Sequence, residues 1–455
     1  MLERLFHLKE HNTDVKTEII AGITTFVSMA YILAVNPNIL GKVMNSNGVF
    51  MATAIASAVA TLIMGFLANY PLALSAGMGL NAYFAFTVCL GELKGVEDPF
   101  RIALTAVLVE GVIFIIMSLF KFREAVVNGI PQNLKYGITA GLGLFIALLG
   151  LEGANIVVAD ESTLVTMGSL KSLPVFLSLL GLMIIVVLDH YKIKGAVLWG
   201  VLITWGIGII AELTGFYIVD PAAGQPSLIP DFTNTFNFSG LGETAFKFDF
   251  QWAGEHFVRF LAVVFSFLFL DFFDTVGTVV GVADRANLMD KNGKLPKAGR
   301  VFMSDAIGTT VGACLGTSTV TTYLESTTGV GAGGRTGLTA ITTGILFLLS
   351  IFLSPIFIAI PSFATAPCLI YVGMLMFGAC KNIEFGKDAA DTIGAFLTIS
   401  IMVLTYSISN GLMYGVLSWV LVKVFTKKAK DINKIMLVIF VLFGLRVVAL
   451  ITGFM

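Results

Sequence analysis

Three acidic residues stand in stretches of sequence that are otherwise apolar enough to lie inside a lipid bilayer. Asp271 and Asp274 belong to the run LDFFDTVGT, and Glu325 belongs to the run TSTVTTYLEST. An acidic residue at the centre of a membrane helix costs roughly 3 kcal/mol unless another group compensates for it. Such residues usually serve a function, so we expect the three carboxyl groups to mark a site within the membrane.

The spacing of the two aspartates suggests proton chemistry. Asp271 and Asp274 are three residues apart, so on a helix they lie on one face. Two carboxylates that close together cannot both ionise cheaply in a low dielectric, and one of them can then hold a proton. We therefore expect Asp271, Asp274 and Glu325 to carry a coupling proton. For each aspartate, the structural alternative is a hydrogen bond to a threonine or a backbone N–H within the helix bundle.

Two stretches rich in Gly, Ser and Thr are predicted to supply the rest of the site. PLALSAGMGLNAYFAF (residues 71–86) and GTSTVTTYLESTTGVG (residues 316–331) are too interrupted for plain transmembrane helices. Irregular backbone at membrane depth is tolerated where it is buried in protein or lines a cavity, and half-helices that start there present positive N-termini. We expect a polar pocket between the two stretches. Its lining residues would be Asn81, Thr321, Thr322 and Glu325.

The side chains of this pocket suit a planar heterocycle better than an inorganic anion. Asn81 offers a donor and an acceptor, whereas Glu325 offers acceptors when ionised and a donor when protonated. A bare anion would call for Arg or Lys, and neither lies in these apolar stretches. Phe84 and Tyr323 are candidates for stacking on a ring, although we expect most of the 38 Phe residues to pack against helices and lipid.

The composition excludes a soluble domain. Of the 455 residues, 56% are hydrophobic and 13% are charged, and the mean hydropathy is +0.91. A membrane-crossing helix needs about 20 mostly apolar residues, and such segments follow one another from residue 19 onward, so we expect an all-α polytopic membrane protein. The net charge of −1 gives no basic surface for nucleic acid. The four cysteines lack CxxC spacing, so neither a metal site nor a disulfide framework is expected.

About 14 transmembrane segments are predicted. They cover residues 19–40, 50–69, 72–90, 102–120, 134–151, 173–188, 195–213, 256–282, 301–315, 318–330, 337–354, 364–380, 391–408 and 410–426. With a cytoplasmic N-terminus, the inside connections hold most of the 28 Lys and Arg residues, including Lys121, Arg123, Lys291 and Lys294. The positive-inside rule therefore favours two cytoplasmic termini. The polar residues 1–18 do not form a cleavable signal peptide.

The chain is predicted to consist of two inverted repeats. An external, proline-containing loop at residues 214–251 is expected to be an irregular linker between two halves of seven segments. The fifth segments of the halves, IPQNLKYGITAGLGLFIALLG (130–150) and IPSFATAPCLIYVGMLMFGAC (360–380), both open with Ile-Pro. Inverted repeats with broken segments at corresponding positions are typical of transporters that bind substrate at the midplane. Chance similarity in low-complexity apolar sequence is the alternative.

Three further features have a less defined role. Residues 434–451 could form a fifteenth span, a re-entrant segment or an interfacial helix, and their central Arg446 favours the last two. Glu110 is expected either to relay protons or to accept an interhelical hydrogen bond. Asp305 begins a segment beside the basic loop, where we expect a topological or capping role.

Several motifs in the right order resemble the nucleobase–cation symporter family of xanthine, uracil and purine permeases. They are DFFDTVGT (271–278), ADRANLMD (283–290), TVTTYLES (319–326) and GGRTGLT (333–339). EIIAGITTFVSMAYILAVNP (18–37) and SAGMGLNAYF (75–84) add to the likeness, which covers nearly the whole chain. The sequence is most similar to the AzgA-like branch of adenine, guanine and hypoxanthine permeases.

This resemblance implies a core domain of segments 1–4 and 8–11 and a gate domain of segments 5–7 and 12–14. In this chain the core would comprise residues 1–125 and 254–358, the external linker residues 215–253, and the gate residues 126–214 and 359–455 with the C-terminal tail. The third and tenth segments would contain short antiparallel strands, and substrate would lie between the third, eighth and tenth segments. Homodimers are common in the family, so we expect a homodimer.

The motif matches imply that this chain has the family's substrate site. The candidate substrate-binding residues are Glu325, Asp274, Asp271, Asn81, Thr275, Thr322, Phe84 and Tyr323. The uracil and xanthine branches generally lack the DxxD pair, which favours a purine.

We therefore expect a secondary active transporter of the cell membrane that imports adenine, guanine and/or hypoxanthine by proton symport and alternating access. Its partners would be the purine base and the lipid bilayer, and it would need no cofactor besides the coupling ion H⁺. A transporter of uracil, xanthine or an inorganic or organic anion on the same architecture is the alternative. An ion channel would need symmetric rings of charge or carbonyls. An enzyme would need a second catalytic cluster, and the sequence offers neither.

Overall fold

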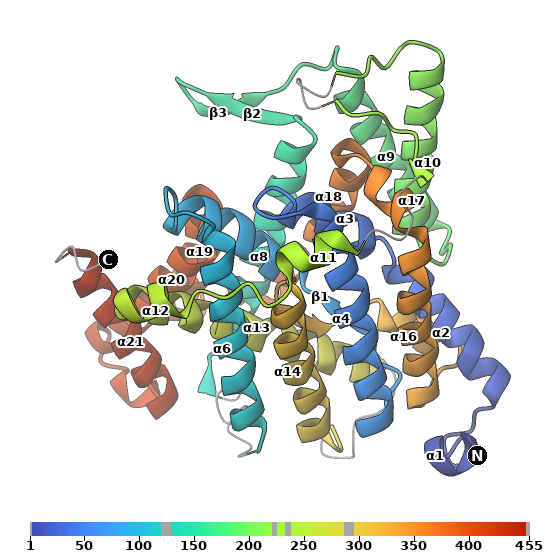
Figure 1. The fold of residues 1–455 in the computed structure, drawn as a ribbon. Coiled ribbons are helices and arrows are strands. Elements are labelled where there is room, and N and C mark those ends of the chain that lie inside the picture. Colours follow the sequence, from blue (N-terminus) through green and yellow to red (C-terminus); the bar gives the residue numbers. More distant parts are fainter. Residues whose placement is uncertain (1, 120–128, 221–224, 233–237, 286–294, 452–455) are drawn as a thin grey trace.

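The computed structural model describes residues 2–119, 129–220, 225–232, 238–285 and 295–451 (Figure 1). Within these residues, nine helical segments are long and apolar enough to cross a membrane. They are α2 with α3 (Val15–Met29, Ile32–Leu40), α4 (Ser46–Leu67), α6 (Pro99–Leu119), α8 (Gln132–Gly153), α9 (Leu173–His190), α10 (Ala196–Leu213), α16 with α17 (Gly337–Leu349, Ser354–Ala359), α18 (Ser362–Phe377) and α20 (Ile408–Phe425). The chain is a multi-pass helical membrane protein.

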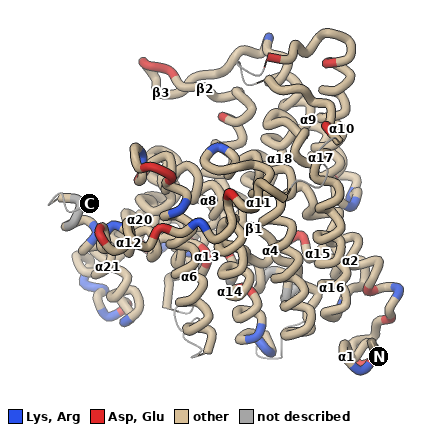
Figure 2. Tube along the Cα trace, in the orientation of Figure 1, with Lys and Arg blue, Asp and Glu red and all other residues tan. Residues whose placement is uncertain are grey.

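Four more helices complete the bundle. They are α13 (Phe257–Arg285), α14 (Ala298–Leu315), α19 (Ala389–Leu404) and α21 (Lys434–Ile451). Short helical elements are α1 (Leu2–Phe6), η4 (Ser350–Leu353), η5 (Gly378–Asn382) and η6 (Ala429–Asp431). Figure 2 shows basic residues at the ends of elements, such as the lower end of α14, and few charges along the middle of the helices. Of the expected cytoplasmic basic residues, Lys121, Arg123, Lys291 and Lys294 lie outside the described residues.

The first membrane segment is divided into two helices. Asp14 caps α2, because its Oδ1 accepts a hydrogen bond of 3.0 Å from the backbone N–H of Thr17. The helix ends at Met29, and α3 follows with Pro37 in its interior. Tyr31 stands at the break, and its side chain is fully buried. The break therefore brings a phenol group into the interior of the membrane region.

The third and tenth segments each combine a short strand with short helices, as expected. The third contains β1 (Leu74–Ala76), α5 (Met78–Ala82) and the π-helix η1 (Tyr83–Glu92), and the tenth contains β4 (Val320–Thr322) and α15 (Ser326–Gly331). The two strands pair antiparallel, with Ser75 opposite Thr321. The strict all-α expectation is therefore wrong at these breaks, where a two-stranded sheet lies among the helices.

Pairing of the strands satisfies backbone groups that would otherwise be exposed at membrane depth. Beyond the strands, Gly77 N donates to Thr319 O at 3.0 Å, and Tyr323 N donates to Ala73 O at 2.9 Å. An unpaired backbone group in hydrocarbon costs several kcal/mol. Helix α14 packs closely against β4, because Gly312 leaves room for Val320, whose Cγ2 is 2.9 Å from where a Cβ would stand.

A second group of helices surrounds α8 and α18. These two helices begin after Pro131 and Pro361, the Ile-Pro positions of the two halves. They pack closely through glycine, since a Cβ on Gly143 would lie 2.5 Å from Phe377 N and a Cβ on Gly373 would lie 2.5 Å from Gly143 O. Helix α19 packs on α8 and α20, and α9 packs on α10 and α18. The corresponding segments of the two halves therefore lie face to face.

The long connection at residues 214–251 is less irregular than expected. It contains α11 (Ser239–Thr244) and the start of α12 (Phe250–Glu255), which Asp249 caps by accepting from Trp252 N at 2.9 Å. Helix α11 packs on α4. The connection after α8 also forms a hairpin of β2 (Val157–Asp160) and β3 (Leu164–Met167), which projects from the top of the bundle in Figure 1.

Residues 434–451, for which three alternatives were considered, form the single unbroken helix α21. It packs on α20. Asn433, just before it, donates to the carbonyl of Gly129. Near its other end, Arg446 lies 3.0 Å from Glu92 of η1 and also donates to Ser409 of α20. The Arg446 side chain is only 12% exposed, so it points from α21 into the helix bundle.

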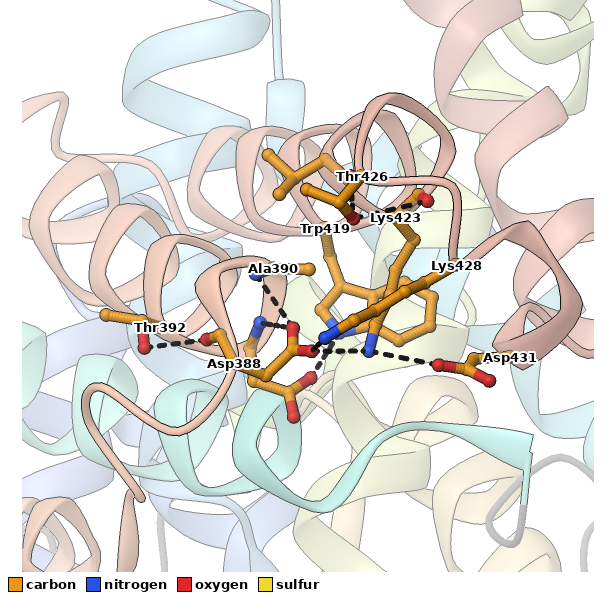
Figure 3. Close-up of polar contacts among 10 residues, drawn as sticks. Asp388, Ala390, Thr392, Trp419, Lys423, Thr426, Lys428 and Asp431 are labelled. Carbon is orange, nitrogen blue, oxygen red and sulfur yellow. Dashed lines mark hydrogen bonds and ion pairs between the residues drawn. The ribbon is translucent and has the colours of Figure 1, made fainter.

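The loops at one end of α19 and α20 form a charged cluster (Figure 3). Asp388 caps α19 by accepting from Ala390 N at 2.9 Å. Its other oxygen lies 2.6 Å from Lys428 Nζ and 3.2 Å from Lys423 Nζ. The hydrogen bond from Lys428 holds the pKa of the Asp388 carboxyl well below its usual range. Lys423 of α20 also lies 3.6 Å from Asp431. The cluster therefore connects α19 and α20 with the segment that leads to α21.

Candidate functional site

Glu325 is positioned by the break in the tenth segment. It stands between β4 and α15, and its side chain is partly exposed. The hydroxyl of Tyr31, at the break of the first segment, donates a hydrogen bond to Glu325 Oε1. Hydrogen bonds to a carboxylate are stronger than neutral ones and fix its orientation. Two broken segments from opposite halves of the chain therefore hold this carboxyl group.

Asp274 lies against the β1–β4 sheet. Its helix, α13, packs on β4, and Thr321 Oγ1 donates to Asp274 Oδ2 at 3.1 Å. Like Glu325, Asp274 keeps part of its side chain exposed. Thr321 is the central residue of β4, so pairing with Ser75 of β1 fixes its place. Asp274 and Glu325 are thus both held by hydroxyl groups and remain able to accept further hydrogen bonds.

Asn81 belongs to α5, directly after the break of the third segment. The hydroxyl of Ser318 donates to Asn81 Oδ1. The side chain is fully buried, and its Nδ2 has no hydrogen-bond partner among the described residues. A buried donor without an acceptor costs about 1–3 kcal/mol. Asn81 is therefore oriented by the tenth segment and keeps an N–H₂ group that a ligand acceptor would satisfy.

Asp271 lies one turn from Asp274 but has different partners. Thr275 Oγ1 lies 2.9 Å from Asp271 Oδ1 and 3.0 Å from Asp305 Oδ2, and all three side chains are fully buried. A hydroxyl has one hydrogen and can donate it to only one of the two carboxyl groups. The second short contact is a hydrogen bond only if the other carboxyl group carries a proton and donates to Thr275. This arrangement can store one proton between α13 and α14.

The expected capping role of Asp305 is wrong. Helix α14 begins at Ala298, and Asp305 lies inside it with a fully buried side chain. In the sequence Asp305 is an acid inside a largely apolar run, which is the same signal that pointed to Asp271 and Asp274. Only the packing of α14 beside α13 reveals that Asp305 and Asp271 share Thr275.

The remaining candidate residues are brought near the sheet but differ in surroundings. Tyr323 Oη donates to the carbonyl of Ala76 at 2.5 Å, so its hydroxyl holds β1. Phe84 is fully buried and packs edge-on against Phe267 with ring centroids 6.2 Å apart. Thr322 is buried, and its hydroxyl has no hydrogen-bond partner within the described part of the chain.

Three residues that contact polar side chains of this region were missed in the sequence analysis. Tyr31 and Ser318 orient Glu325 and Asn81, and Thr319 Oγ1 donates to Glu110 Oε2 at 3.0 Å. The Glu110 contact matches the interhelical hydrogen bond that was one of its two expected roles. The run TSTVTT signals a hydroxyl-rich strand, but sequence alone does not say which acid each hydroxyl meets.

No group of His, Cys, Asp or Glu within the described residues could hold a metal ion. The four cysteines are free. The ion pairs seen between described residues lie at Glu10, Glu92, Glu384, Asp388 and Asp431, away from this cluster of acids. The arrangement of Asp274, Glu325 and Asn81 can therefore bind a small ligand through hydrogen bonds at a partly exposed carboxyl pair.

Comparison with known proteins identifies the family. Residues 16–414 match the Permease family, Xan_ur_permease. The chain is 45% identical to the guanine/hypoxanthine permease PbuO of Bacillus subtilis (strain 168), over 96% of this chain and 98% of that protein. It is 37% identical to the adenine permease AdeP of Escherichia coli (strain K12), over 98% of this chain and 96% of that protein.

A solved structure supports the fold independently. The transmembrane domain of a cyanobacterium bicarbonate transporter, BicA, superimposes with a TM-score of 0.63 over 88% of this chain and 97% of that chain. Sequence identity in that comparison is 16%, so the likeness concerns the fold alone. The chain therefore belongs to the Permease family and is a membrane transporter rather than an enzyme.

Proposed function

We propose that this protein is a secondary active transporter that imports purine nucleobases by proton symport through alternating access. Relatives similar over nearly the whole chain are permeases for guanine and hypoxanthine or for adenine, which supports a purine substrate. The finer architecture belongs to the same proposal. It comprises about 14 segments in inverted repeats, core and gate domains with the boundaries given above, two cytoplasmic termini and a homodimer.

The observation that carries the proposal is the meeting of the two broken segments. Strands β1 and β4 pair, and this pairing brings Asn81 of one half toward Ser318 of the other. Asp274 and Glu325 offer acceptors to ring N–H groups, and the Asn81 N–H₂ group offers a donor to a ring nitrogen or carbonyl. A purine edge alternates donors and acceptors in the same way. Asp271, Thr275 and Asp305 would hold the coupling proton beside this pocket.

Substitution of Glu325 tests the assignment of the site. Uptake of labelled guanine, hypoxanthine or adenine into cells lacking their own purine permeases should fall at least a hundredfold in Glu325→Ala, because an acceptor bonded to the base is lost. Glu97→Gln, an exposed acid, is the matched control and should transport normally. Uptake at normal affinity in Glu325→Ala would overturn the site.

Competition tests the alternative substrates. Unlabelled adenine, guanine or hypoxanthine should block uptake, whereas uracil, xanthine, sulfate and bicarbonate should not. The anions are disfavoured because Asp274 and Glu325 would repel them, and neither acid forms an ion pair with another described residue. Block by an anion but not by purines would replace the base with an anion as substrate.

A further inference from the structure

A cavity lined by charged, polar and apolar side chains lies around Arg446 of α21, and its lining includes none of the candidate site residues. It has a volume of about 550 Å³ and includes Glu92 of η1, Arg259 of α13, Asn410 of α20 and Arg446 in its lining. Sites for small molecules usually measure about 300–1,000 Å³. The space, called here the Arg446 cavity, is therefore large enough for a bicyclic base.

Arg446 is held firmly in the wall of this cavity. Its Nη2 lies 3.0 Å from Glu92 Oε1, and its Nη1 donates to Ser409 and lies 3.3 Å from Ser266 Oγ. The guanidinium Nε has no acceptor among the described residues, although the side chain is only 12% exposed. A nearly buried donor without a partner is unfavourable by about 1–3 kcal/mol. An acceptor atom of a ligand would remove that cost.

The other lining groups provide what a planar ring needs. The rings of Phe86 and Tyr406 line the cavity and offer apolar faces. Tyr406 is fixed in place, since its hydroxyl donates to Glu152 and its ring packs against Phe145 at 5.5 Å. The side-chain amide of Asn410 has no hydrogen-bond partner in the described part of the chain, and it offers one donor group and one acceptor.

The charge pattern argues against an inorganic anion as the occupant. Arg259 and Arg446 are positive, but Glu92 stands in the same wall and already pairs with Arg446. Glu92 offsets the charge of Arg446 by pairing with it, which leaves Arg259 as the one lining guanidinium that this pair does not compensate, whereas a neutral heterocycle can use both signs of charge along its edge. The mixture of Arg, Glu, Asn and aromatic side chains therefore fits a planar nitrogen heterocycle.

The cavity is also connected to the candidate site by one continuous helix. Helix η1 begins at Tyr83, two residues after Asn81, and ends at Glu92 in the wall of the cavity. The Tyr406 carbonyl accepts from Thr87 Oγ1 of the same helix at 3.3 Å. The Arg446 cavity thus lies at the far end of the half-helix that carries Asn81, in contact with α20 of the second helix group.

From this geometry we infer that the Arg446 cavity is a second binding site for the transported base, which the base occupies before or after the site at Glu325. The inference rests on the proposed function, since it takes the same substrate class. Bound base would accept a hydrogen bond from Arg446 Nε and pack against the ring of Tyr406. It would also accept a hydrogen bond from the Asn410 amide N–H₂ group and donate one to the Asn410 amide oxygen.

Equilibrium binding to the full-length protein in lipid nanodiscs tests this inference. Labelled guanine, hypoxanthine and adenine should bind with up to two equivalents per chain for the preferred base. Glu325→Gln and Asn410→Leu should each reduce binding to one equivalent, and the double variant should bind none. Ser418→Ala, on the same helix as Asn410, is the control and should keep two equivalents. Unchanged thermal stability of Asn410→Leu would show that the fold is intact.

The two proposals fail in different ways. A wild-type protein that binds one equivalent, lost completely in Glu325→Gln and unchanged in Asn410→Leu, would overturn the second site and leave the proposed function standing. A wild-type protein that binds none of the three bases would overturn the proposed function. Displacement of the Asn410-dependent equivalent by sulfate or bicarbonate but not by unlabelled base would identify the cavity as an anion site and refute the inference.

Discussion

At the scale of single residues, hydroxyl groups determine how the acids of the candidate site are presented. Glu325 accepts from Tyr31, Asp274 from Thr321, and Asn81 from Ser318. In each pair the donor comes from a different segment than the acceptor. A donor that fixes the orientation of a binding side chain lowers the conformational entropy which that side chain would otherwise lose when the ligand binds. The affinity for substrate should therefore depend on residues that need not touch it.

Removal of the Tyr31 hydroxyl should show this dependence. A hydrogen bond to a charged group contributes about 1.5–3 kcal/mol, so Tyr31→Phe should raise the KM for the transported base by roughly tenfold or more. The ring is kept, so the protein should still reach the membrane in normal amounts. Transport assays over a range of base concentrations measure the change.

Tyr414→Phe is the matched control for this variant. Tyr414 lies on α20 and is 49% exposed, so loss of its hydroxyl should leave KM unchanged. Equal KM values for Tyr31→Phe and the wild type would mean that the Tyr31 hydroxyl does not position Glu325 for binding.

Sequence reasoning identified the acids but not their partners. Asp271, Asp274 and Glu325 stand out because each is an acid in an apolar run. Asp305 carries the same signal, yet its contact with Thr275 depends on how α14 packs beside α13. The contact between Tyr31 and Glu325 has no signal in the sequence, because the two residues are 294 positions apart. Such long-range pairs follow from tertiary packing and not from local pattern.

At the scale of elements, the breaks were predictable, whereas their exact form was not. The small-residue runs at 71–86 and 316–331 predicted interruptions, and the family resemblance implied the strands β1 and β4. The π-helix η1 has no signal of this kind, since its residues YFAFTVCLGE would suit an ordinary α-helix. Helix α21 was ambiguous because Arg446 is unfavourable in a lipid-facing span, and only its pairing with Glu92 explains its burial.

The cluster at Asp388 gives an element-scale prediction about pH. Lys428 lowers the pKa of Asp388 in the folded protein, so the interaction stabilises the fold above the ordinary carboxyl pKa of about 3.9. Its contribution is lost as the pH falls below that value toward the lower folded pKa. Asn also caps helices well, so Asp388→Asn should keep the cap and remove only the charge.

Thermal unfolding in detergent measures this effect. At pH 7, Asp388→Asn should have a Tm lower than the wild type by about 2–4 °C, and the difference should begin to shrink only as the pH falls below about 3.9 toward the lower pKa of Asp388 in the folded protein. Glu97→Gln, an exposed acid, should show no such trend. A difference in Tm that is absent at pH 7, or that is already lost by about pH 5, would contradict the role assigned to the charge.

At the scale of the whole molecule, the proposed proton symport would couple the membrane potential to a small number of buried acids. A potential of about 100 mV is worth about 2.3 kcal/mol per charge, enough for roughly fiftyfold accumulation if one proton moves with each base. The contact of Thr275 with both Asp271 and Asp305 is the place where we expect that proton. Accumulation should therefore collapse when a protonophore removes the gradient.

Asp305→Asn should separate coupling from transport. The amide can donate to Thr275 without carrying a titratable proton, so the variant should equilibrate base across the membrane but no longer concentrate it. In vesicles with an imposed proton gradient, the ratio of the base concentration inside to that outside should fall from about fifty to about one. Asp98→Asn, at an exposed loop position, is the control. Full accumulation by Asp305→Asn, or dependence on sodium in place of protons, would refute this role.

The pairing of β1 with β4 also has a consequence for how the protein is made. The two strands are separated by about 240 residues, and ribosomes add about 5–20 residues per second. During roughly 12–50 seconds of synthesis, β1 has been made but its hydrogen-bonding partner has not. Its backbone groups must meanwhile be satisfied by water, by neighbouring helices or by the insertion machinery. The first half of the chain is therefore a vulnerable intermediate during biogenesis, and substitutions in either strand should reduce the yield of inserted protein before they affect transport.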